Sequence, residues 1–167
     1  MPLWVIFLIQ AAFSYLGTAA FAICVNNPRR ALHACGLCGM VGWLAYWTVF
    51  QLGAGRMIAN VTGSLVLGIM SLIFARRKKM PAILFNIPGI VPLVPGVTAY
   101  QAVYEMVLGS VDQAIVYSFR VAMVAGAIAI GFMLTSLFAE VWTRIRRRRQ
   151  QSKPPVITPT KTTSKDQ

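Results

Sequence analysis

Five long apolar blocks constrain the fold of this chain more than any other feature. The first block, residues 3–25, carries no charged side chain, and a helix of that length rises far enough to cross a hydrocarbon core of about 30 Å. Hydrophobic residues make up 57% of the chain, well above the roughly 45–50% of soluble proteins. The other apolar blocks occupy residues 31–52, 57–75, 80–104 and 113–139. We therefore expect an all-α integral membrane protein, with a polytopic domain over residues 1–149.

The basic residues follow the ends of these blocks. The net charge is +12, and the positive side chains gather at Arg29–Arg30, at residues 76–79 and at residues 144–149. Lys and Arg near span ends stay on the cytoplasmic side of a membrane. The pattern thus indicates membrane orientation rather than a nucleic-acid surface, although the last cluster could also attract anionic lipid headgroups.

Five spans, with the N-terminus outside and the C-terminus in the cytoplasm, place every basic cluster on one side. Only Arg56 and Arg120 then lie outside or in the outer part of a span. An alternative with four spans and a re-entrant segment at residues 80–104 leaves one cluster on the wrong side. The first block lacks the basic start of a signal peptide and is too long for one, so we interpret it as a retained span. The tail, residues 150–167, is rich in Pro, Thr, Ser and Lys and is predicted to be disordered.

The fourth block contains the segment "PGIVPLVPG", residues 88–96. A proline has no amide hydrogen and clashes with the carbonyl four residues before it, so Pro88 frees the carbonyl of Leu84, and Pro92 and Pro95 act likewise. Irregular backbone at membrane depth survives only where protein buries it or where it lines a cavity. We therefore predict a break with a functional role, the alternative being a kinked helix that packing alone stabilises.

The sequence after the break again permits a helix. The free amides of residues 96–98 would carry the positive end of its dipole, which suits a carboxylate. Discontinuous helices bind anionic groups in this way in many transporters. Thr98, Gln101 and Glu105 share one face of this helix, and they would extend a polar stripe from the break toward the outside.

Polar residues also occur at depth in other blocks. Arg120 lies about two turns into the last one, where a charge is costly and is a functional candidate by default. It could bind an anionic solute, reach the interface, or pair with Glu105 or Asp112. Small and polar residues in the second, third and last blocks predict close helix packing, and those of the third block could also line a solute path. These residues are Gly36, Gly39, Gly42, Asn60, Ser64, Gly68, Ser71, Ala122 and Gly126.

No residue pattern predicts a cofactor, a metal or a catalytic site. The stretch "HACGLC", residues 33–38, offers three soft ligands, whereas a structural zinc site needs four. The acidic residues are too scattered to form an acid–base pair, and neither a nucleophile with a supporting base nor a phosphate loop occurs. An enzyme embedded in the membrane is therefore disfavoured.

Two stretches resemble a known family. "FAICVNNPRRAL" (21–32) and "PGIVPLVPGVTAY" (88–100) are similar to the small-subunit, or C-terminal-half, domain of the threonine/serine exporter family, and the resemblance covers roughly residues 5–140. It implies a proton-driven exporter of amino acids or succinate-like dicarboxylates in the bacterial inner membrane. It also implies a partner, a larger membrane subunit that carries the N-terminal half. By position, the broken segment and Tyr100 would line the solute path, and Pro28–Arg29 would form a turn.

The residues and the resemblance together define a set of candidate substrate-binding residues. These are Pro88, Gly89, Pro92, Pro95, Gly96, Thr98, Tyr100, Gln101, Glu105 and Arg120. The leading interpretation is the small subunit of a two-component exporter of a small carboxylate. The alternatives are a non-transporting accessory or assembly protein and a homo-oligomeric channel that acts without a partner.

Overall fold

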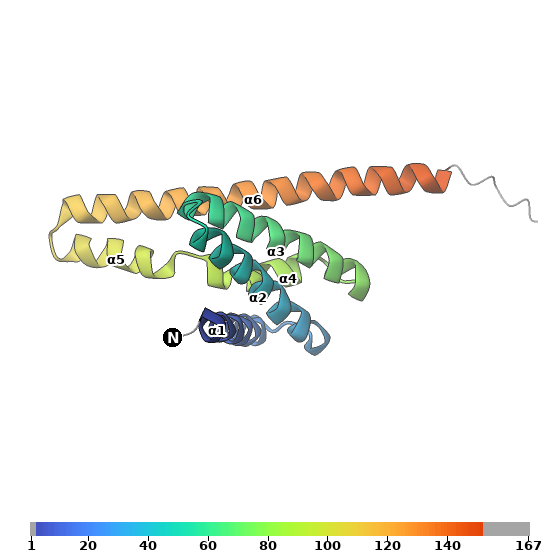
Figure 1. Cartoon of the computed structure of the whole chain (residues 1–167), viewed down its shortest axis with the longest axis horizontal. Helices are drawn as coiled ribbons and strands as arrows, with labels where there is room; N and C mark the ends of the chain where they lie inside the picture. The colour runs from blue at the N-terminus through green and yellow to red at the C-terminus, as the bar shows by residue number, and fades with distance from the viewer. Residues whose placement is uncertain (1–2, 152–167) are drawn as a thin grey trace, which may run out of the picture.

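The computed structural model describes residues 3–151, and it is built from helices joined by short turns (Figure 1). No strand occurs in this part of the chain, so the predicted all-α fold class is confirmed. Of the predicted tail, only residues 150–151 are described, and they end the last helix; residues 152–167 lie outside the described range. The elements are α1 (Leu3–Cys24), α2 (Arg29–Gln51), α3 (Arg56–Lys78), α4 (Ile83–Gly89), the 3-10 turn η1 (Val91–Leu93), α5 (Gly96–Val107) and α6 (Val111–Gln151).

Four helices, α1, α2, α3 and α6, are long and apolar enough to cross a membrane. The fourth predicted segment forms α4, η1 and α5, and its two halves are bent by 57° at the break. Counting this bent pair as one span gives five crossings, and counting it as re-entrant gives four. The chain is thus a multi-pass membrane protein with a broken fourth segment. Full crossing by residues 80–104 stays a prediction.

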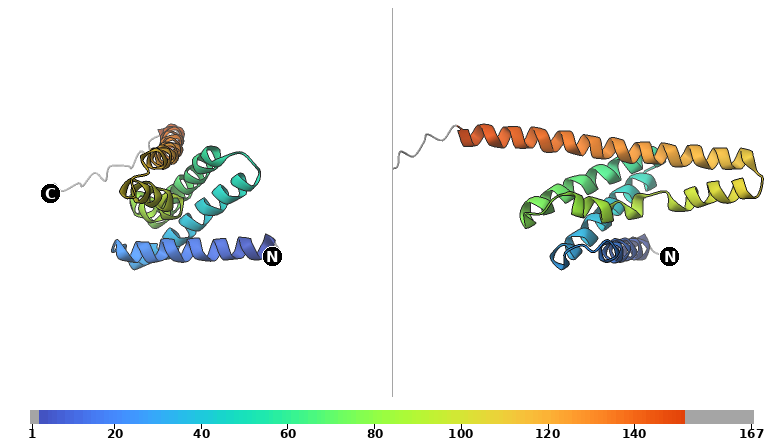
Figure 2. Two further views of the ribbon diagram at one scale, coloured as in Figure 1. Left: turned by 90° about the vertical axis from the view of Figure 1, so that its left-hand side faces the viewer. Right: turned by 180° about the vertical axis from the view of Figure 1, so that it is seen from behind.

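Two helical hairpins organise the molecule. The first consists of α2 and α3, and the second of α5 and α6, whose far end extends away from the other helices (Figure 1). The two hairpins pack together through α3 and α6. Helix α1 packs on α2 and runs crosswise to α6, since Figure 1 views α1 almost end-on and the left view of Figure 2 shows it lengthwise. Helix α4 packs against α2, so the broken segment begins inside the helix assembly.

Small residues let these helices approach closely. A Cβ added at Gly39 of α2 would collide with the side chain of Thr18 on α1. A Cβ at Gly68 of α3 would lie 2.5 Å from the Thr135 hydroxyl on α6. Such contacts are common between membrane helices, where dispersion and polar contacts replace the hydrophobic effect. For Gly126 the prediction of close packing was wrong, because the space around it is open; Gly131 makes the close approach to α3 instead.

The break begins with a carbonyl that has lost its helical partner. Pro88 cannot donate to the Leu84 carbonyl, and this carbonyl instead accepts a hydrogen bond of 2.8 Å from the side-chain amide of Asn27. The Cys35 thiol lies 3.4 Å from the same oxygen. Asn27 follows α1 and is buried, while Pro88 and Cys35 are also buried. The turn between α1 and α2 therefore satisfies a backbone group that the proline leaves unpaired.

In the rest of the break, most backbone groups form hydrogen bonds to other backbone groups of the same segment. The Ile90 amide donates to the Asn86 carbonyl at 3.0 Å, and the Ile90 carbonyl accepts from Leu93 at 2.8 Å. The Gly96 amide donates to the Val94 carbonyl at 2.8 Å. The prediction that the Gly96 amide is free was therefore wrong. The next two amides, in the first turn of α5, receive no capping side chain because the N-cap residue is Pro95.

We predict that Gly39→Ala lowers the melting temperature of the detergent-purified protein. The added methyl group has to displace Thr18, and overpacking of this kind costs about 1–3 kcal/mol. The matched control is Gly17→Ala, a helical glycine with nothing within 4 Å of the added group. The control should leave the melting temperature unchanged or raise it, because alanine has the higher helix propensity. Equal melting of both variants would contradict the close α1–α2 contact.

We also predict that Asn27→Ala and Pro88→Ala are non-additive in the free energy of unfolding. Asn27→Ala alone leaves the Leu84 carbonyl without its principal donor, at a cost of about 1–3 kcal/mol. Pro88→Ala restores an amide that can bond that carbonyl within the helix. In the Pro88→Ala background, Asn27→Ala should then cost less than half as much. Strictly additive losses in a denaturation series would show that the two residues act independently.

Candidate functional site

A cavity of about 160 Å³ lies where the broken segment meets the two hairpins. Residues from α2, α3, η1, α5 and α6 and from the turn before α5 line it: Trp43, Tyr46, Arg56, Asn60, Pro92, Leu93, Val94, Pro95, Thr98, Arg120 and Val124. A second cavity of about 350 Å³ shares Arg56, Arg120 and Val124 with the first. The two arginines thus line both cavities, and the first cavity also contacts the start of α5.

These two arginines are the charged groups of the site. Arg56 is the first residue of α3, and Arg120 lies on α6, with its guanidinium 5.6 Å from the centre of the Tyr117 ring. Neither arginine forms an ion pair with a residue that the structure describes, so of the alternatives for Arg120 the pairing with Glu105 or Asp112 does not occur. Two guanidinium groups without a counter-charge suit an anionic ligand, because their planar donors match carboxylate or phosphate oxygens.

The position of the arginines along their helices matches the thickness of a bilayer. Arg56 and Arg76 are separated by about 30 Å along α3, at 1.5 Å per residue. Arg120 and Glu140 are separated by the same rise along α6. Both intervals equal a typical hydrocarbon core. This spacing would place the two arginines near one membrane boundary if the basic clusters lie near the other.

The walls of the cavity are held by hydrogen bonds and ring contacts. Trp43 donates its indole N–H to the Gln10 side chain at 2.8 Å, and its ring lies 5.1 Å from that of Tyr46. On α3, Asn60 is only 3% exposed, and its side-chain amide donates to the Arg56 carbonyl at 2.8 Å. The cavity is therefore lined by aromatic side chains of α2, by polar side chains from the first turns of α3, and by the proline-rich break.

The structure brings four of the predicted site residues together and separates the others. Pro92, Pro95, Thr98 and Arg120 line the cavity. Pro88 and Gly89 are buried in the helix packing, where a Cβ on Gly89 would lie 2.9 Å from Leu67. The remaining four residues lie on α5 outside the cavity lining: Gly96, Tyr100, Gln101 and Glu105. Tyr100 is 68% exposed and stacks on Tyr104 instead.

The sequence-based site set left out Arg56, Asn60, Trp43 and Tyr46. A signal existed for the first two. Arg56 is the other basic residue that the topology separates from the cytoplasmic clusters, and Asn60 follows it by one helical turn, with its side chain on the same face. No comparable signal marked the two aromatic residues, because aromatic side chains at such spacing also pack in any membrane helix.

The histidine and cysteines of α2 take part in helix packing. The His33 ring accepts or donates a hydrogen bond at 2.9 Å to the Tyr15 hydroxyl of α1. Cys35 and Cys38 are fully buried, and Cys35 faces the Leu84 carbonyl. Within residues 3–151, His, Cys, Asp and Glu side chains form no group of three that could hold a metal ion.

Comparison with known proteins identifies a family that matches this sequence. The model of the family described as "Threonine/Serine exporter, ThrE" matches residues 10–138. A probable threonine/serine exporter of Mycobacterium tuberculosis is 26% identical over 128 residues, which cover 74% of this chain and 24% of that protein. An uncharacterized protein of Haemophilus influenzae is 26% identical over 133 residues, or 75% of this chain and 45% of that protein.

The chain therefore spans less than half the length of these two relatives. No solved structure matches it significantly. The family match, by contrast, includes α2 to α5 completely and most of α1, together with all four predicted residues that line the cavity. Because this match extends over most of the sequence, the chain belongs to the threonine/serine exporter family.

Proposed function

We propose that this chain is the small subunit of a two-component exporter of small carboxylates, driven by the proton gradient across the bacterial inner membrane. Its N-terminus would lie outside and its C-terminus in the cytoplasm. The observation that carries the proposal is the cavity beside the start of a half-helix, lined by two arginines that form no ion pair with any residue the structure describes. The family match supports export as the activity.

The site offers several donors to a carboxylate. Arg56 and Arg120 can form charge-assisted hydrogen bonds with its oxygens. The uncapped amides in the first turn of α5 and the Thr98 hydroxyl add neutral donors, and the positive end of the helix dipole points the same way. The cavity therefore suits a solute group that carries negative charge.

The charge of the site favours one solute class within this proposal. Among residues 3–151 no acidic side chain lines the cavity, so the described part of the chain supplies no counter-charge there for the ammonium group of threonine or serine. A second carboxylate, as in a succinate-like solute, fits two arginines better. An amino acid would need an acidic group from the partner subunit.

The far end of the α5–α6 hairpin supports a larger membrane partner. If the Arg120 level marks a membrane boundary, the start of α6 extends about 13 Å beyond it. Apolar side chains there are exposed, with Val107 at 80% and Phe119 at 66%. Apolar side chains that stay exposed beyond the membrane suit an interaction with another protein. We propose that a larger subunit, which carries the N-terminal half of the exporter, covers this end.

We predict that Arg56→Gln and Arg120→Gln each reduce export strongly. Losing one charged hydrogen bond to the solute costs about 1.5–3 kcal/mol, so the initial rate below saturation should fall roughly tenfold to a hundredfold. The measurement is efflux of labelled succinate, threonine and serine from cells that express this chain with its partner. Arg77→Gln is the control, since it removes the same charge from an exposed site outside the cavity. Unchanged export by both cavity variants would favour the accessory-protein alternative.

We further predict that export needs two subunits. Cells that express this chain alone, the large subunit alone or both should export labelled carboxylate only in the third case, with membrane insertion confirmed by blotting. Export by this chain alone would identify a homo-oligomeric channel. Export by the large subunit alone would remove this chain from the solute path.

A further inference from the structure

A third cavity in the molecule lies between α3 and α6, toward the basic ends of both helices. The two helices touch where Gly68 meets Thr135, and the Thr135 hydroxyl lies 3.3 Å from the Leu65 carbonyl. Beyond this contact the helices diverge, as Figure 1 and the right view of Figure 2 both show. The cavity lies between the two helices on this diverging side of the contact.

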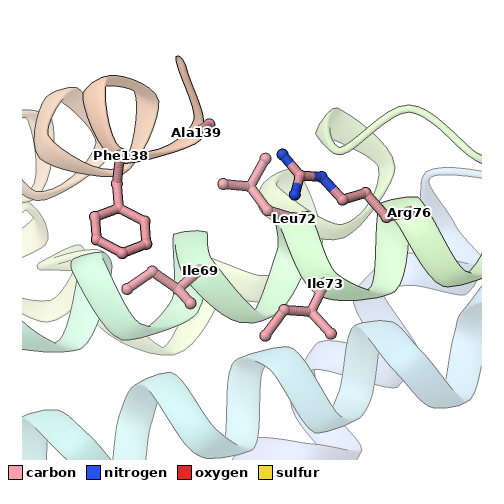
Figure 3. Close-up of a pocket in the computed structure, with 6 residues that line it drawn as sticks. All are labelled: Ile69, Leu72, Ile73, Arg76, Phe138 and Ala139. Carbon is pink, nitrogen blue, oxygen red and sulfur yellow. The ribbon is translucent and has the colours of Figure 1, made fainter. Parts of the chain in front are cut away.

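This cavity forms a groove with an apolar floor and a cationic end. Its volume is about 120 Å³, and it is lined by Ile69, Leu72, Ile73, Arg76, Phe138 and Ala139. Figure 3 shows Phe138 reaching from α6 toward Ile69 on α3, with Arg76 at the far end of the row of aliphatic side chains. We refer to these six residues as the α3–α6 groove.

The charge around the groove is positive. Arg76, Arg77 and Lys78 form the last turn of α3. On α6, Arg144 pairs with Glu140 at 3.2 Å, and both side chains are well exposed. The groove thus runs from apolar side chains at hydrocarbon depth to several cations at the headgroup level. A phospholipid carries matching groups in the same order, an apolar acyl chain followed by a negatively charged phosphate.

We propose that the α3–α6 groove binds an anionic phospholipid, with part of one acyl chain between the helices and the phosphate at Arg76. Basic pockets between membrane helices bind anionic headgroups in this way. An acyl chain in the groove restores the dispersion contacts that the diverging helices lose. A zwitterionic lipid could fill the same groove, but its headgroup gains less from Arg76 and its cationic neighbours. The bound lipid would hold α3 and α6 at a fixed angle below the candidate solute site.

The test is native mass spectrometry of the full chain in detergent, titrated with phosphatidylglycerol or with phosphatidylcholine of the same acyl chains. We expect one saturable phosphatidylglycerol per chain, bound about fivefold more tightly than phosphatidylcholine. Arg76→Gln should weaken phosphatidylglycerol binding about fivefold, to the level of phosphatidylcholine. Arg77→Gln removes the same charge from a residue outside the groove, and it should change binding less than twofold. Equal losses in the two variants would overturn the site in favour of diffuse attraction to the basic cluster.

A second pair of variants tests the apolar part. Ala139→Phe fills the groove and should weaken binding of both lipids, whereas Ala129→Phe, on the exposed surface of α6, should weaken neither. Matching melting temperatures would establish that both variants fold. Full lipid binding by a folded Ala139→Phe protein would overturn the groove as the acyl site. Absence of saturable lipid binding, with a second copy of the chain bound instead, would identify the groove as a protein interface.

Discussion

The hydrogen bond from Asn27 to the Leu84 carbonyl is the constraint on which the broken segment depends. A proline at membrane depth leaves a carbonyl that lipid cannot satisfy, and the cost of leaving it unpaired is several kcal/mol. Here the donor comes from a turn 57 residues earlier in the chain. Because Asn27 and Cys35 both face this oxygen, α4 is fixed against α2 before the chain turns at η1. That placement brings Pro92, Pro95 and Thr98 to the cavity that contains Arg56 and Arg120.

Much of the fold followed from the sequence because the bilayer limits the options. The charge-free length of the first block and the proline spacing in the fourth predicted long helices and one broken segment, and these are present. The end of α6 did not follow in the same way. Apolar character marks the part of a helix that lies in lipid, but Arg is also a good helix former, so the helix continues through residues 144–149.

The site was predictable only in part, for a geometric reason. Pro92, Pro95 and Arg120 stood out because a break and a charge at depth are costly, and all three line the cavity. Gln101 and Glu105 were grouped with Thr98 by helical periodicity, which says which residues share a face. Periodicity does not say where that face turns away from the cavity, and only Thr98, in the first turn of α5, reaches the lining. Likewise, Asn27 could not be matched with Leu84, because no local pattern links a turn to a distant carbonyl.

The two glycines that flank the proline segment differ in their surroundings, and this difference has a mechanical meaning. Prolines fix the backbone angle φ at three positions of this segment, so the bend that they form is stiff. Gly89, at one end, is locked against Leu67, whereas Gly96, at the other end, is exposed with open space around it. We infer that rotation between the halves of the bent segment is concentrated at Gly96. The first turn of α5, which contains Thr98, can then shift while α4 stays anchored and α6 stays packed on α3, and such a shift changes the position of Thr98 relative to the two arginines.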